Sequence, residues 1–199
     1  MKRALVIFMA PLVMSLAGCG AGNTVAIAPN APLVAAEGDT SLESLHRARY
    51  TVLVFFTAHC PVQKAHDARM RELADAFRAQ GVAFVGVASE VGADAGAANA
   101  AARSRGLPFP VVVDRGARLA DALGVEYSTH VVVLGAPANA GGSGEARRSV
   151  LYSGAIDSDG AFLSTSAKHY LRDALSDLVG GAAVRTSRTE ALGCPLRKR

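Results

Sequence analysis

The chain has 199 residues, of which 50% are hydrophobic, and its formal net charge is +4. This length is sufficient for one domain with a sizeable hydrophobic core. The small positive excess does not predict a nucleic-acid partner, and it falls further if the N-terminal Lys2 and Arg3 are removed.

Residues 1–18 are predicted to be an export signal. Two basic residues precede an apolar stretch over residues 4–16, which is short for a membrane span. The sequence LAGC at residues 16–19 resembles a bacterial lipobox, which implies a lipoprotein with Cys19 lipidated and held at the membrane. Gly20 at the next position implies the periplasmic side of the outer membrane. An ordinary signal peptide that leaves Cys19 free is the alternative.

Three regions are expected after this signal. Residues 19–38 are rich in Ala, Gly, Pro and Asn without a hydrophobic period, which predicts a flexible tether. A domain over residues 39–182 follows, and its first element is a short helix over residues 41–48. The tail over residues 183–199 contains Cys194 and has no pattern of its own.

Strands and helices alternate through most of this domain. Tyr50 to Thr57 is a continuous apolar run, typical of a strand buried on both faces of a parallel sheet. Pro61 suits the first turn of a helix that we expect to reach Gln80 and to end at Gly81. The patterns predict further strands over residues 82–88, 110–113, 130–134 and 150–153, and further helices over residues 93–105, 117–123 and 168–179. A long polar hairpin loop separates the last two strands. This order predicts a three-layer α/β fold with a mixed central sheet.

Four segments carry a resemblance to a known family: VLVFFTAHCP, GVAFVGVASE, LPFPVVVDRGARLADALGVEYSTHVVVL and SGAID. Through them the chain resembles the thioredoxin-like redoxins, the group that includes peroxiredoxins of the alkyl hydroperoxide reductase and thiol-specific antioxidant type. The resemblance covers about residues 40–180. It implies a thioredoxin-like fold, thiol oxidoreductase or peroxidase activity and no bound cofactor. It also implies a peroxide or protein thiol or disulfide substrate, and a reducing partner that the sequence does not name.

The sequence departs from the active-site patterns of this group. Gln63 and Lys64 stand where a second cysteine would follow Cys60 in thioredoxins and in copper-delivery proteins. The peroxiredoxin pattern Pro-x-x-x-Thr-x-x-Cys is matched by Thr57 and Cys60, although its proline position holds a leucine. Related proteins place a cis-proline in the turn before the fourth strand. In this chain that position holds Thr129, or His130 if the register slips by one residue.

Cys60 is the candidate redox nucleophile because it lies between the expected buried strand and the helix that Pro61 begins. A helix N-terminus stabilises a thiolate, and the adjacent His59 can contribute positive charge when protonated. The loop carrying His130 is expected to face Cys60, where this histidine can act as acid, base or ligand. His66 is expected at the surface of the helix.

Cys194 is the candidate partner of Cys60. The phrase RTEALGCPL resembles the tail of a redoxin subgroup with one active-site Cys-Pro and a distant Gly-Cys, which implies that the two cysteines pair. Export would place them in an oxidising compartment. Cys194 then either resolves oxidised Cys60 during catalysis or forms a static disulfide with it in a non-catalytic scaffold. A third hypothesis is a copper or zinc module using Cys60, Cys194 and His130, but their spacing predicts no compact metal site.

Overall fold

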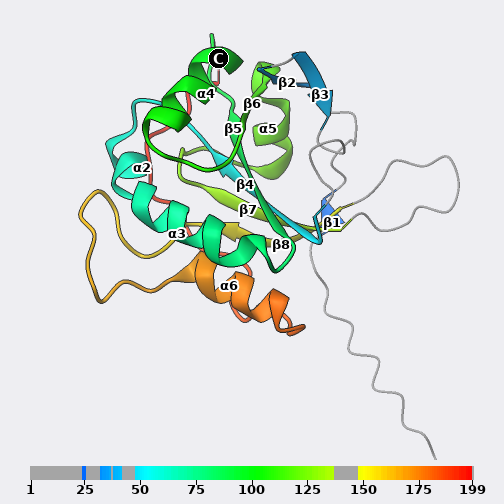
Figure 1. Ribbon diagram of the computed structural model, residues 1–199, viewed down its shortest axis with the longest axis vertical. Coiled ribbons are helices and arrows are strands. Elements are labelled where there is room, and N and C mark those ends of the chain that lie inside the picture. Colours follow the sequence, from blue (N-terminus) through cyan, green and yellow to red (C-terminus); the bar gives the residue numbers. More distant parts are fainter. Residues whose placement is uncertain (1–23, 26–31, 37, 42–47, 137–147, 199) are drawn as a thin grey trace, which may run out of the picture.

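The computed structural model describes residues 24–25, 32–36, 38–41, 48–136 and 148–198 (Figure 1). Its strands form an eight-stranded mixed sheet in the order β1-β8-β7-β4-β5-β6-β2-β3. The strands are β1 (Thr24–Val25), β2 (Pro32–Ala35), β3 (Gly38–Ser41), β4 (Tyr50–Phe55), β5 (Val82–Ala88), β6 (Val111–Asp114), β7 (Val131–Gly135) and β8 (Arg148–Gly154). The pairs β4–β5 and β5–β6 are parallel, whereas β7 runs antiparallel to both β4 and β8.

Helices cover both faces of this sheet, which confirms the predicted three-layer α/β fold. They are α2 (Pro61–Ala65), α3 (Asp67–Arg78), α4 (Ala95–Ser104), α5 (Arg118–Leu123) and α6 (Tyr170–Val179). Strand β4 shows how its residues supply both hydrophobic layers. Val52 and Val54 join the apolar cluster of α3, α4 and α6, whereas Leu53 and Phe55 join that of α5. The continuous apolar run is therefore required because side chains alternate across a strand.

The helix expected over residues 61–80 is divided at His66 into α2 and α3. The Nδ1 atom of His66 bonds the carbonyl of Val62 at 2.8 Å, and the His66 amide donates to the carbonyl of Gln63 at 3.1 Å. In an uninterrupted α-helix, the amide of residue 66 would donate to Val62. The imidazole takes the place of the amide, so the turn tightens and a new helix begins.

The segment expected to be a tether contributes strands where it is described. β2 pairs antiparallel with β6 and β3, and Leu33 is 1% exposed within the α5-side cluster. This pairing corrects the expectation of a flexible tether for residues 32–35, since β2 satisfies the hydrogen-bonding groups at the edge of β6. Residues 42–47, where most of the expected first helix lies, are outside the described residues, as are residues 137–147 of the hairpin loop.

The C-terminal tail crosses the domain after α6. In Figure 1, α6 lies at the bottom of the view and the C-terminus at the top. Ala191 and Leu196 of the tail are 9% and 7% exposed, so the tail is packed against the domain rather than free. The tail sequence has no hydrophobic period because the tail is attached to the domain through backbone groups and only a few side chains.

Candidate functional site

Cys60 lies at the N-cap of α2, after β4 and a short turn. Its side chain is almost fully buried, at 2% exposed, and Pro61 occupies the first helical position. The carbonyl of Cys60 accepts the amide of Lys64 at 3.0 Å, which is the first hydrogen bond of the helix. The predicted strand, cysteine and helix are therefore observed in this order, although α2 has only five residues.

Cys60 forms a disulfide with Cys194. The two residues are 134 positions apart in the sequence, and their Cα atoms are 5.7 Å apart. Both sulfur atoms are thus oxidised and joined to each other, so neither is a free thiolate ligand for a metal ion. The described residues contain no group of three or more His, Cys, Asp or Glu side chains arranged to hold a metal ion.

The loop before β7 holds the tail on either side of Cys194. The amide of Ser128 donates to the carbonyl of Cys194 at 2.9 Å, and the amide of Leu196 donates to the carbonyl of Glu126 at 2.9 Å. Tyr127 and Pro195 lie opposite each other in antiparallel register. The tail therefore lies along this loop like a short added strand.

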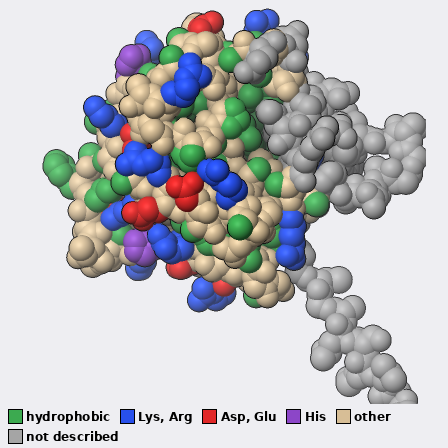
Figure 2. Space-filling view, viewed as in Figure 1, with side chains coloured by type: hydrophobic (Ala, Val, Ile, Leu, Met, Phe, Trp, Pro, Cys, Tyr) green, Lys and Arg blue, Asp and Glu red, His purple; other side chains and the backbone are tan. Residues whose placement is uncertain are grey.

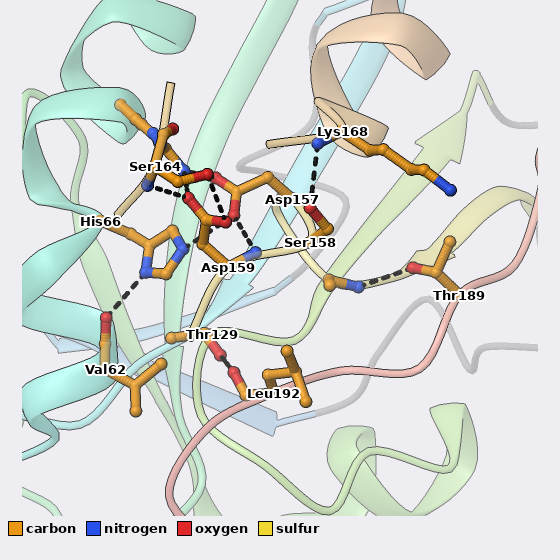
Figure 3. A network of polar contacts seen from close by, with 12 residues as sticks. Val62, His66, Thr129, Asp157, Ser158, Asp159, Ser164, Lys168, Thr189 and Leu192 are labelled. Atoms are coloured by element: carbon orange, nitrogen blue, oxygen red, sulfur yellow. Dashed lines mark hydrogen bonds and ion pairs between the residues drawn. The ribbon is translucent and has the colours of Figure 1, made fainter. Parts of the chain in front are cut away.

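Thr129, the residue at the expected cis-proline position, has a positive φ of 68°, and none of the described peptide bonds is cis. Its amide donates to the carbonyl of Phe55 at 3.0 Å, which connects the loop to β4. Its hydroxyl lies within hydrogen-bonding reach of the carbonyls of Ser128 and Leu192 (Figure 3). Thr129 therefore contacts the tail directly, beside Cys194.

Gly193 is required by the close approach of the tail to this loop. A Cβ atom at residue 193 would lie 1.9 Å from the carbonyl oxygen of Ser128 and 2.7 Å from the hydroxyl of Thr129. No side chain fits such a distance. The Gly-Cys pair noted in the sequence thus has a steric reason, which the sequence pattern alone did not supply.

His130 is buried and contacts the neighbouring strand β8. Its Nε2 atom lies 2.8 Å from the hydroxyl of Ser153, and its ring meets the Phe55 ring edge-on at 6.4 Å between centroids. Burial, with a smaller contribution from Arg188, lowers the pKa of His130 to about 4. The imidazole is therefore neutral at neutral pH and supplies no positive charge to a thiolate. The exposed His59 remains the candidate for that role from the sequence.

Thr57 lies between β4 and Cys60, and its hydroxyl, amide and carbonyl are all hydrogen-bonded. Its hydroxyl donates to Glu90 Oε2 at 2.6 Å, and its amide donates to Gln63 Oε1 at 2.9 Å. Arg105 donates to its carbonyl at 3.2 Å and forms an ion pair with Asp67. Sequence reasoning selected Thr57 but missed Glu90. The signal was available, because Glu90 follows β5, which neighbours β4 in the parallel part of the sheet.

The expectation that His66 lies at the surface of the helix is wrong, because this residue is only 2% exposed. Besides its bond to Val62, its Nε2 atom lies 3.1 Å from Asp157 Oδ1, and Arg69 donates to the other oxygen of Asp157 at 2.6 Å (Figure 3). Burial lowers the pKa of His66, but the hydrogen bonds to Asp157 and Val62 outweigh this effect, so the net pKa is raised. Both ring nitrogens face oxygen acceptors, which favours the imidazolium form.

On the face seen in Figure 2, Lys and Arg side chains are interspersed with acidic and hydrophobic ones and form no continuous patch. In the part of the chain that the structure describes, no helix combines the length and apolar character needed to cross a membrane.

The chain matches a known family and several solved structures. The AhpC/TSA family model matches residues 26–150. A hypothetical protein from Sinorhizobium meliloti 1021 is similar with 21% identity over 83% of this chain and 89% of its own, at a TM-score of 0.67. An uncharacterised conserved protein from Geobacillus kaustophilus is similar with 22% identity over 88% of this chain and 94% of its own, at a TM-score of 0.68.

A thioredoxin-like protein in the oxidised form shares 16% identity over 78% of this chain and 93% of its own, at a TM-score of 0.53. No protein with a curated description matches the chain significantly. The structural similarities establish the fold, and the family match spans more than half of the sequence. The chain therefore belongs to the AhpC/TSA family of thioredoxin-like redoxins.

Proposed function

We propose that this protein is a thiol-dependent oxidoreductase that reduces a hydroperoxide, with Cys60 as nucleophile and Cys194 as resolving cysteine. The observation that carries the proposal is the Cys60–Cys194 disulfide at the junction of β4 and α2 in an AhpC/TSA family member. A disulfide at this position is the expected product of one turnover.

The oxidative half-reaction uses both cysteines. The Cys60 thiolate attacks one oxygen of the hydroperoxide, the O–O bond breaks, and the leaving alkoxide takes a proton to become an alcohol. Cys60 is then a sulfenic acid. The Cys194 thiolate attacks the sulfur of Cys60, the S–O bond breaks, and hydroxide leaves as water after taking a proton. Two electrons have passed from the two thiols to the hydroperoxide.

A dithiol reductant completes the cycle. Cys60 is 2% exposed whereas Cys194 is half-buried, so the incoming thiolate attacks the sulfur of Cys194. The Cys60 thiolate is the leaving group, and its position at the start of α2 favours the ionised form. The second thiol of the reductant then releases Cys194, and the reductant carries away the disulfide.

We also propose that the protein is exported and lipid-anchored at Cys19, on the periplasmic side of the outer membrane. The support is the order of basic residues, apolar stretch and LAGC sequence, all of which lie outside the described residues. Metabolic labelling with a radioactive fatty acid tests this part: the wild-type chain is labelled and a Cys19→Ser chain is not. Equal labelling of the two chains would exclude the anchor at Cys19.

The proposed activity is tested with a chain that carries Cys19→Ser, so that only Cys60 and Cys194 can react. The protein is reduced, freed of reductant and mixed with one equivalent of hydrogen peroxide, and its thiols are counted by alkylation and mass spectrometry. We expect rapid loss of both thiols and formation of the internal disulfide. With Cys194→Ser added, oxidation stops at a sulfenic acid that dimedone captures, and with Cys60→Ser neither product forms.

A different outcome would support the alternative of a non-catalytic scaffold. If the bridge resists mild reductant, or if the reduced pair reacts with peroxide no faster than the unfolded chain does, the disulfide is a structural one. The unfolded chain in urea is the matched control, since it contains the same two thiols without the fold.

A further inference from the structure

The tail between Ser187 and Lys198 is attached to the domain on both sides of Cys194 by contacts that involve neither sulfur atom. The two sets of contacts are called here the Thr189 anchor, which comes before Cys194, and the Lys198 anchor, which comes after it. Their presence raises the question of where the tail lies once the disulfide is reduced.

The Thr189 anchor joins the tail to the end of β8. The Thr189 hydroxyl accepts the amide of Ala155 at 2.9 Å (Figure 3). It also lies 2.7 Å from the hydroxyl of Tyr152. The amide of Thr189 donates to the carbonyl of Ser153 at 3.1 Å. A Cβ atom on Gly154 would lie 2.1 Å from the Thr189 hydroxyl oxygen, so the tail and β8 are in close backbone contact.

The Lys198 anchor joins the tail to α5 and to the segment that follows it. The Lys198 ammonium donates to Asp121 and Glu126 at 2.8 Å each, and to the carbonyl of Val125 at 3.0 Å. The carbonyl of Arg197 accepts the amide of Val91 at 2.8 Å. Opposite charges and backbone bonds therefore hold this end independently of Cys194.

Between the anchors, the tail uses the hydrogen-bonding groups of the loop before β7. The Ser128 amide and the Glu126 carbonyl both bond to tail backbone atoms. An extended polypeptide that approached Cys60 along this loop would need the same two groups. A small molecule would not need them.

From this arrangement we infer that the tail stays docked in the dithiol state, so that Cys60 accepts small oxidants such as hydroperoxides and excludes extended polypeptides. The inference rests on the proposed function and adds to it that the docked tail excludes polypeptide substrates from Cys60. It also means that Cys194 remains beside Cys60 after reduction, ready to attack the sulfenic acid without refolding of the tail.

The first test compares two oxidants on the single thiol of a Cys19→Ser, Cys194→Ser chain. One is a small aromatic disulfide, and the other is an extended peptide whose cysteine carries the same aromatic thiol as a mixed disulfide. Both release the same coloured thiol when Cys60 attacks. The quantity compared is the ratio of the two rates, small disulfide over peptide, in the folded and in the urea-unfolded chain. We expect this ratio to be about tenfold or more higher in the folded chain, since the anchors must open before the peptide can enter.

Two variants show whether the Thr189 anchor causes this selection. Thr189→Val removes the hydroxyl that Tyr152 and Ala155 contact, and we expect it to raise the rate with the peptide and not with the small disulfide. Thr186→Val makes the same chemical change at an exposed tail position and is expected to leave both rates unchanged. Equal selectivity of the folded and unfolded chains, or equal effects of the two variants, would overturn the inference.

Hydrogen exchange on the wild-type chain is the second test and needs no variant to fold. The amides of Thr189, Cys194 and Leu196 donate to the domain and report directly on docking of the tail. We expect their protection to persist in the reduced protein, and its loss on reduction would overturn the inference. Peroxide consumption is measured separately, so absence of turnover with a docked tail would reject the proposed function and leave the docking intact.

Discussion

Ser128 and Cys194 are joined by reciprocal hydrogen bonds. The Ser128 amide donates to the Cys194 carbonyl at 2.9 Å, and the Cys194 amide donates to the Ser128 hydroxyl at 3.2 Å. This pairing fixes the backbone of the tail where its sulfur meets Cys60. The loop before β7 thus helps to place Cys194 against Cys60.

Gly193→Ala is expected to slow formation of the disulfide by about tenfold or more, because the added methyl group must displace the tail from the Ser128 carbonyl. The measurement is the rate of thiol loss after one equivalent of peroxide. Gly160→Ala is the matched control, since a Cβ atom there would meet nothing within 4 Å. Similar rates for the two variants would contradict the close fit seen at residue 193.

Thr57→Val is expected to lower the rate of Cys60 oxidation by about tenfold, because it removes the hydroxyl that donates to Glu90 and so loosens the turn that positions Cys60. Thr57→Ser keeps a hydroxyl and is expected to retain most of the rate. Dimedone capture of the sulfenic acid in the Cys194→Ser background measures this single step. If the valine and serine variants react equally, the hydroxyl has no part in it.

His66 is expected to stabilise the fold most strongly at slightly acidic pH. Its pKa in the folded state is raised, so its contribution is complete below its unfolded pKa of about 6.5 and is lost as the pH rises through the folded value. The partner Asp157 has a lowered pKa, so its contribution is lost only in stronger acid. The free energy of unfolding of wild type and His66→Gln should therefore differ more at about pH 5.5 than at about pH 9.

Urea denaturation at the two pH values measures this difference, and groups common to both chains cancel from it. Arg78, an exposed residue that pairs with Asp75 on α3, supplies the control variant Arg78→Gln. Its effect should be small and similar at both pH values, as for a solvent-exposed ion pair. A difference for His66→Gln that does not change with pH would show that the ring is not charged in the fold.

His130 is expected to act in the opposite direction. Its pKa is lowered to about 4 in the folded state, so the unfolded chain binds the proton first and stability falls as the pH decreases from about 6.5 toward 4. Below about pH 4 the loss in the free energy of unfolding reaches about 3 kcal/mol. His130→Phe should reduce the dependence of the free energy of unfolding on pH between about 6.5 and 4, as measured by urea denaturation. An unchanged slope would mean that the imidazole is accessible to protons in the native state.

The local sequence was sufficient to predict the elements around Cys60. The apolar run of β4 and the proline that begins α2 are present as expected, and the helix expected to reach Gln80 is present but divided at His66 into α2 and α3. These patterns are informative because burial imposes a period of two residues on strands and of nearly four on helices. The resemblance to redoxins also implied the pairing of Cys60 with Cys194, which the structure contains.

Only the tertiary structure decided which polar groups meet. The contacts of His66 with Asp157, of Thr57 with Glu90 and of Ser128 with Cys194 join residues 91, 33 and 66 positions apart. No local pattern encodes such contacts, because they depend on the order of strands in the sheet and on the path of the tail. The addition of β2 to the sheet edge has the same origin. The sequence by itself therefore determined the fold class and, through its resemblance to redoxins, the pair of cysteines that forms the disulfide, whereas long-range packing decided how the tail is held beside Cys60.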